Sequence, residues 1–161
     1  MEQLPDVAAL VAIYNQINTY GRVNGMHLTA QQPGVVQYTM SILEEHLSSP
    51  GTCHGGVLAG LMDAALGAAA LSLAFTAGEL VSTVEFKINY LHPVHLHDQL
   101  VAHANVEHSG KTLIVSSAFI SCPARNNLVV ARGMGTFNRY PADKRDFHHL
   151  LLPDTGLGEL K

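Results

Sequence analysis

The chain has 161 residues, enough for one domain with a sizeable core and too few for two independent ones. With 47% hydrophobic and 14% charged residues, it differs clearly from the composition of disordered chains. A formal net charge of −4 and the lack of a local basic patch argue against nucleic-acid binding. The scarcity of charge also predicts that a second copy of the chain covers part of the apolar surface.

Cysteine usage and the first residues bear on the compartment. The two cysteines, Cys53 and Cys122, form no CxxC pair, and free thiols are typical of a reducing compartment. Met1 to Asp6 is polar and acidic, whereas a secretory signal begins with a basic residue followed by an apolar stretch. We therefore expect a cytoplasmic protein.

The first elements are a helix and a hairpin. Within residues 1–20, apolar side chains recur at the spacing of an amphipathic helix, which we expect to belong to the main domain. A glycine-containing break at 21–25 ends this helix. Two strands are predicted next, over 26–30 and 35–43, and the Pro33-Gly34 turn between them indicates a hairpin.

A long apolar stretch follows, from Gly55 to Thr76, with Asp63 as its single charge. About 20 apolar residues are enough to cross a bilayer, so a membrane span is one interpretation. However, the stretch is rich in alanine and glycine, contains an acid, lacks flanking Lys or Arg, and precedes strands. We therefore predict a buried core helix and no membrane association.

Four further strands are predicted, over residues 81–91, 99–107, 112–120 and 128–137. Turns separate them, and the middle two form a hairpin. A sheet of five or six mainly antiparallel strands around one apolar helix is an α+β architecture. The main domain is thus expected over 21–139, with 140–161 as a peripheral tail.

Gly55 and Gly56 stand at the predicted start of the core helix. Backbone N–H groups there lack helical partners, and this end of a helix is positive. Glycine also lets a ligand approach the backbone closely, as an oxyanion hole around a carbonyl requires. The plainer alternative is a tight turn with a glycine cap.

Asp63 is the second candidate. A carboxylate inside an apolar helix is costly to bury unless it has a partner or chemistry to perform. The alternative is a structural acid that reaches the wet edge of the helix or pairs with a buried donor. Together with the glycine pair, the catalytic interpretation is favoured.

The spacing of these residues constrains how they act together. Gly55 and Asp63 are eight residues apart, which corresponds to roughly 12 Å along a helix axis. A carboxylate and an oxyanion donor must flank one carbonyl within about 3 to 4 Å. If both serve one site, Asp63 must face Gly55 of a second subunit, as a twofold dimer with antiparallel helices allows.

Longer motifs carry a resemblance. They are Gly51-Thr52-Cys53-His54-Gly55-Gly56 followed by Asp63, then Thr83–Pro93, Ser109–Thr112 and Ala131–Phe137. This pattern, spanning about residues 21–139, resembles the PaaI-like hotdog thioesterases. The resemblance implies a hotdog fold, in which a curved antiparallel sheet wraps a long helix. It also implies dimers, often paired into tetramers, and hydrolysis of acyl-coenzyme A (acyl-CoA) thioesters.

The resemblance assigns roles residue by residue. The position of Asp63 supplies the carboxylate that attacks the thioester carbonyl or activates water, and Gly55 supplies the oxyanion amide. Thr83 matches a hydroxyl that orients the water or carboxylate, although threonine is also an ordinary strand former. Ser48 stands where many relatives carry asparagine, and serine lacks the two amide donors. His54 is expected mainly to fix the loop that presents Gly55.

The resemblance also implies a coenzyme A channel, with Asn138 near its nucleotide end. The residues expected to border the channel are Tyr90, Leu91, His92, Pro93, Val94 and His95 in one segment, and His108, Ser109, Gly110, Lys111, Thr112 and Leu113 in another. Lys111 is a candidate to meet a phosphate or, equally, a solvated turn residue. Coenzyme A is part of the substrate, so no separate cofactor is expected.

Three functions fit these residues to different degrees. The favoured one is an acyl-CoA thioesterase acting as a homodimer or dimer of dimers. A hotdog dehydratase would need a catalytic histidine paired with an acid, whereas His54 lies on the oxyanion loop. A non-catalytic acyl-CoA-binding protein would keep the channel and turn over poorly because of Ser48.

Two other chemistries are not expected. His92, His95 and His97 suggest a metal, and the last two would share a face of an extended segment. However, the sequence fixes no third ligand of suitable type, and the nearby Pro93 indicates a loop. Adjacent residues of an extended segment point to opposite sides, so Cys53 and His54 form no catalytic dyad.

Overall fold

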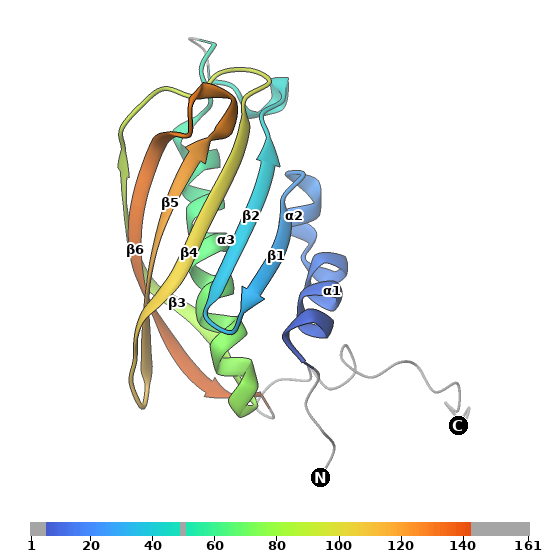
Figure 1. Ribbon diagram of the computed structural model, residues 1–161, viewed down its shortest axis with the longest axis vertical. Coiled ribbons are helices and arrows are strands. Elements are labelled where there is room, and N and C mark those ends of the chain that lie inside the picture. The colour runs from blue at the N-terminus through green and yellow to red at the C-terminus, as the bar shows by residue number, and fades with distance from the viewer. Residues whose placement is uncertain (1–5, 49–50, 143–161) are drawn as a thin grey trace, which may run out of the picture.

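The computed structural model describes residues 6–48 and 51–142. One long helix, α3 (Gly55–Ala74), lies against a curved antiparallel sheet that wraps around it (Figure 1). The sheet has six strands in the order β1-β2-β4-β5-β6-β3. Their bounds are β1 His27–Gln32, β2 Val35–Ser41, β3 Glu79–Tyr90, β4 Gln99–Ser109, β5 Leu113–Cys122 and β6 Leu128–Pro141. This is the predicted hotdog fold of the α+β class, with six strands.

Two shorter helices precede the sheet, α1 (Val7–Ile17) and α2 (Thr19–Val23), and α1 packs beside β1 (Figure 1). Three 3₁₀ turns complete the elements, over Glu44–His46, Phe75–Ala77 and Pro123–Arg125.

Burial by the sheet accounts for the composition of α3. The segment Gly55–Ala77 has a mean hydropathy of 1.8 and is long enough to cross a membrane by length and composition. Strands β2 to β6 nevertheless all pack along α3, and Leu61, Met62 and Leu66 have no exposed surface. An apolar helix covered in this way is the core of a folded domain. The prediction of a buried core helix is therefore confirmed.

Close approach between α3 and the sheet depends on small residues. A Cβ atom at Gly133 of β6 would lie 2.7 Å from the Met62 sulfur and 2.8 Å from the Lys87 carbonyl oxygen. Side chains of β2 alternate in burial, with Val36, Tyr38 and Met40 buried against the helix. The helix is thereby held at a fixed height and rotation over the sheet.

Several predicted boundaries shift. The break predicted at 21–25 is wrong in its first part, because α2 continues helical structure to Val23. A cap explains this helix, since the side chain of Asn18 accepts a hydrogen bond from the Gly21 N–H. Strand β6 runs to Pro141, two residues into the predicted tail, and residues 143–161 of that prediction lie outside the described residues.

The two edges of the sheet differ. Strand β1 is flanked by α1, where the Asn15 side chain donates to the Leu28 carbonyl and accepts from the Leu28 N–H, both at 2.9 Å. Strand β3 forms the opposite edge and pairs only with β6 in the described ranges 6–48 and 51–142. An open edge of 12 residues is a ready template for pairing with another strand.

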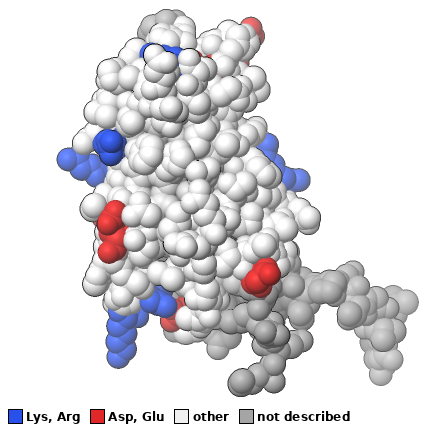
Figure 2. Space-filling view, viewed as in Figure 1, with Lys and Arg blue, Asp and Glu red and all other residues white. Residues whose placement is uncertain are grey.

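The outer face of the sheet is poor in charge. Figure 2 shows this face, on which the Lys, Arg, Asp and Glu side chains are few and lie mainly towards the margins. A row of paired side chains crosses it: the Gln37 amide contacts His103 Nδ1 at 3.0 Å, His103 stacks on Phe119, and Arg132 lies over the Phe119 ring. This face therefore has the polarity of a contact surface rather than of a fully solvated one.

The Asn15 bridge should contribute measurably to stability. Asn15→Ala leaves both polar groups of Leu28 without their side-chain partner, so we expect the free energy of unfolding to fall by about 1–3 kcal/mol. Urea denaturation followed by circular dichroism measures this. The matched control is Gln16→Ala on the exposed face of the same helix, expected within about 0.5 kcal/mol of the parent protein. Equal losses in the two variants would contradict the bridge.

Candidate active site

The start of α3 presents one unpaired backbone donor. His54 is the N-cap residue of α3, and its Nδ1 accepts a hydrogen bond from the Gly56 N–H at 2.9 Å. The His54 carbonyl oxygen accepts from the Val57 N–H at 3.0 Å. In the described part of the chain, no group accepts a hydrogen bond from the Gly55 N–H. This donor at the positive end of a 20-residue helix is suited to hold a negatively charged oxygen.

The loop before Gly55 is fixed by backbone hydrogen bonds. The His54 N–H donates to the His46 carbonyl and the Cys53 N–H to the Val94 carbonyl, both at 2.8 Å. Ser48 closes the turn, because its N–H and its Oγ donate to the Thr52 carbonyl oxygen at 2.7 and 3.0 Å. The Ser48 hydroxyl is therefore committed to the loop and does not reach Asp63 of the same chain.

A hollow of about 310 Å³ opens beside Gly55. The Tyr90 hydroxyl donates to the Gly55 carbonyl oxygen at 2.9 Å and so ties the helix start to the end of β3. The other residues that line the hollow are Thr52, Cys53, Leu58, Leu91, His92, Pro93 and Val94. The structure thus brings the first predicted channel segment, apart from His95, next to the predicted oxyanion amide.

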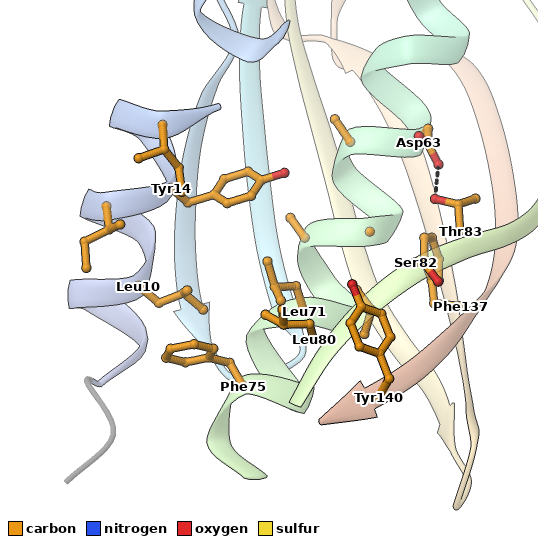
Figure 3. Close-up of a pocket in the computed structure, with 16 residues that line it drawn as sticks. Leu10, Tyr14, Asp63, Leu71, Phe75, Leu80, Ser82, Thr83, Phe137 and Tyr140 are labelled. Carbon is orange, nitrogen blue, oxygen red and sulfur yellow. Dashed lines mark hydrogen bonds between the residues drawn. The ribbon is translucent and has the colours of Figure 1, made fainter. Parts of the chain in front are cut away.

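Asp63 lies two turns further along α3, and its side chain is half-buried. One carboxylate oxygen accepts a hydrogen bond from Thr83 Oγ1 at 3.0 Å (Figure 3). Asp63 borders a cavity of about 310 Å³ and a wider opening of about 510 Å³. The carboxylate therefore has both a donor and access to open space, which offsets the cost of its place on an apolar helix.

Tyr14 of α1 projects across the cavity towards α3 (Figure 3). Burial, and to a smaller extent the Asp63 carboxylate, raise the pKa of the Tyr14 phenol above its ordinary value. A phenol is protonated near neutral pH even at its ordinary pKa, so Tyr14 places a neutral hydroxyl in the lining of the cavity that Asp63 borders. Sequence reasoning missed this residue; its position on the apolar stripe of α1 was the available signal.

The second predicted channel segment lies at the other end of the sheet. His108 to Leu113 forms the β4–β5 hairpin, and Leu113 pairs with Asn138 of β6. Arg139 fixes this hairpin: its Nη1 donates to Ser109 Oγ and to the Gly110 carbonyl, both at 3.1 Å, and it forms an ion pair with Glu79. Lys111 and Thr112 are exposed.

One chain does not bring the predicted site residues together. Tyr90 pairs with Ala131 and Leu113 with Asn138, seven residues along β6, which is roughly 23 Å. The Gly55 amide and the Asp63 carboxylate likewise lie eight positions apart on one helix. Each chain therefore carries two separate groups of predicted site residues, one at Gly55 and one at Asp63, which we call half-sites.

No metal site accompanies these half-sites: within residues 6–48 and 51–142, no three His, Cys, Asp or Glu side chains are grouped to hold a metal ion.

The fold and these half-sites define the class of hotdog-fold thioesterases, and comparison with known proteins agrees. Residues 50–125 match the Thioesterase superfamily. The chain is 32% identical over 129 residues to acyl-coenzyme A thioesterase 13 of Homo sapiens, covering 79% of this chain and 89% of that protein.

Solved structures extend the comparison. The PaaI protein from the E. coli phenylacetic acid degradation operon superposes with a TM-score of 0.74 at 26% identity, covering 83% of this chain and 91% of that one. A hypothetical thioesterase from Streptococcus pneumoniae, solved with coenzyme A, shares the fold with a TM-score of 0.62 at 22% identity over 72% and 86% of the two chains. The chain therefore belongs to the PaaI-like hotdog thioesterases, as its motifs predicted, and is a thioester hydrolase.

The cysteines offer a test of the structure of the loop before Gly55. Burial, with a smaller effect from Asp98, raises the pKa of the Cys53 thiol to about 11, and burial also raises that of Cys122. Because only the thiolate reacts with iodoacetamide, the folded protein should resist labelling at pH 8 and react faster as the pH approaches 11. Peptide mass spectrometry measures the labelling, with the urea-unfolded chain as the reactive control. Rapid labelling of folded Cys53 at pH 8 would contradict this structure of the loop.

Proposed function

We propose that this protein is a soluble cytoplasmic enzyme that hydrolyses acyl-CoA thioesters in a homodimer. Each of two equivalent sites contains Asp63 of one subunit and the Gly55 amide of the other. The proposal requires no metal or redox cofactor, and coenzyme A leaves as a product.

The observation that carries this proposal is the way α3 is tied to the open edge strand. Asp63 is bonded to Thr83 and Gly55 to Tyr90, so both half-sites are anchored on β3. A bulge between Thr83 and Glu85 turns Thr83 and Tyr90 to the same face of the sheet, opposite Phe137 and Ala131 of β6. The two anchors are therefore equally distant from Lys87, which pairs with Met134 midway between them.

Twofold pairing of β3 about Lys87 would complete the sites. In an antiparallel pair centred there, Thr83 of one chain lies opposite Tyr90 of the other. Asp63 then faces the second subunit's Gly55, and Lys87 faces its own copy with a Glu85 close by from each strand. The same pairing covers Val84, Tyr90 and Met134, which are 57%, 51% and 52% exposed.

The same twofold pairing would bring together the two predicted segments of the coenzyme A channel. Asn138 pairs with Ser82 and Leu113, so the hairpin segment lies beside the Thr83 end of β3. Pairing about Lys87 brings that end next to the second subunit's Tyr90 end, where the hollow beside Gly55 opens. A coenzyme A bound across the interface would then contact both predicted segments. The charge-poor face in Figure 2 is available for pairing of two such dimers.

In each composite site the thioester carbonyl oxygen accepts a hydrogen bond from the Gly55 N–H, which stabilises the charge that develops on it. The Asp63 carboxylate, oriented by Thr83, either attacks the carbonyl carbon or removes a proton from an attacking water. The carbon–sulfur bond then breaks, and the thiolate of coenzyme A takes up a proton. If Asp63 attacks, water hydrolyses the resulting anhydride; both routes give the free acid and coenzyme A.

Mixed dimers test the sharing of sites between subunits. Gly55→Pro removes the amide donor with little strain, because proline is favoured at the first helical position and His54 already has the extended ψ of 135° required before proline. Gly55→Pro and Asp63→Asn should each lower kcat/KM by about 100-fold or more. A purified mixed dimer has one intact composite site, so its kcat per dimer should recover to about half that of the parent enzyme.

Differently tagged subunits, co-expressed and purified in tandem, give the mixed dimer. Each variant paired with itself under the same two tags is the control. If the mixed dimer stays as inactive as these controls, the site lies within one subunit. If the parent protein binds acyl-CoA but turns over no member of an acyl-CoA panel, the alternative of a non-catalytic binding protein is correct.

Thr83 provides a second test. Thr83→Val keeps the shape of the side chain and removes the donor to Asp63, so we expect kcat to fall about tenfold. Thr83→Ser retains the hydroxyl and should restore most of the rate, which steady-state kinetics with thiol detection would measure. Equal rates for the valine and serine variants would show that the hydroxyl has no part in hydrolysis.

A further inference from the structure

A largely apolar cavity of about 310 Å³ extends from Asp63 between α1, α3 and β3 (Figure 3). Its lining on α3 lies along one face of the helix, and small side chains at Ala64, Gly67 and Ala68 leave room there. Asp63 and Leu71 on this face lie eight positions apart, which corresponds to roughly 12 Å along the helix axis. The cavity is therefore elongated along the helix axis rather than rounded.

The deep end of the cavity is closed by side chains from separate elements. Leu10 of α1, Phe75 after α3 and Leu80 of β3 form a small buried cluster there, with Leu71 packed against it. The mouth is more polar, since Asp63, Ser82 and Thr83 line it.

Helix α1 supplies the outer wall. Leu10, Ile13, Tyr14 and Ile17 follow the i, i+3, i+4, i+7 spacing and all line the cavity. Among the residues that the structure describes, Asp63 is the only charged one in the lining. These residues therefore offer no cation to a second carboxylate, and Asp63 would repel a carboxylate that came near it.

Resting on the proposed function, we infer that this cavity binds the acyl chain of the substrate and selects straight, uncharged aliphatic chains of about eight to ten carbons. A water molecule in the liquid occupies about 30 Å³, and a methylene group is of roughly the same size. A cavity of about 310 Å³ therefore holds roughly ten carbons of a straight chain. The carbonyl would lie at Asp63 and the methyl end near Leu71.

The experiment compares kcat/KM for straight-chain acyl-CoA thioesters from acetyl to hexadecanoyl, together with aryl and ω-carboxyl thioesters of equal carbon number. Each added methylene should raise kcat/KM by about fourfold until the cavity is full, with a maximum near eight to ten carbons. A flat profile, a preference for aryl groups, or ready turnover of ω-carboxyl chains would overturn the inference.

Two leucine-to-alanine variants on α3 test where the methyl end of the acyl chain lies. Leu71→Ala enlarges the deep end, so the ratio of dodecanoyl to octanoyl kcat/KM should rise about tenfold. Leu73→Ala is the matched control, because Leu73 is also partly buried on α3 but does not line the cavity. Its profile should match that of the parent protein. An unchanged ratio in Leu71→Ala, with native melting behaviour, would exclude this placement.

Binding measurements distinguish a failure of this inference from a failure of the proposed function. Calorimetric titration of the Asp63→Asn variant with the same thioesters measures chain-length preference without turnover. Affinity that rises to about ten carbons supports the cavity even if hydrolysis fails. Hydrolysis that depends on Asp63 while affinity is independent of chain length overturns the cavity assignment and leaves the thioesterase function standing.

Discussion

The proposed site depends on a rigid constraint: one buried helix carries both the free Gly55 amide and the Asp63 carboxylate. Because the sheet covers α3 along its length, the segment from Gly55 to Asp63 stays helical, and the two residues cannot come closer together. Hydrogen bonds from Tyr90 and Thr83 then fix both positions against one strand. Gly55 and Asp63 are too far apart for one complete site, but their spacing along the β3 edge is fixed. A second copy that pairs with this edge, as proposed, would meet both groups at that fixed spacing.

The two sheet edges explain why association would be directional. At β1 the side chain of Asn15 satisfies the outward backbone groups of Leu28, so this edge is occupied at its centre by the protein's own helix. At β3 the edge carries the anchors of both half-sites, and apolar side chains such as Val84 lie exposed beside it. Sealing one edge and leaving the other open restricts strand pairing to the edge that carries the chemistry.

Features encoded locally were predictable from the sequence. The six strands, the core helix and the glycine pair at its start follow from patterns of a few residues, and the lone acid at Asp63 is visible against its apolar neighbours. Contacts that join distant segments were not predictable from such patterns. The meeting of Tyr14 with the Asp63 cavity depends on how α1 docks, and the cap by Asn18 extended a helix through glycine. Docking is decided by the summed packing of many side chains.

Helix α1 joins two properties that are separate in the sequence. Asn15 faces the β1 edge and holds the helix in place, whereas its neighbour Tyr14 and the stripe from Leu10 to Ile17 face the cavity. A change in the length or packing of α1 would therefore reshape the cavity at Asp63 while leaving Gly55, Asp63 and their anchors on β3 untouched. Under the proposed function, this separation would let the same reacting groups serve different acyl groups, because selectivity would depend on a peripheral helix and the reaction on the core helix.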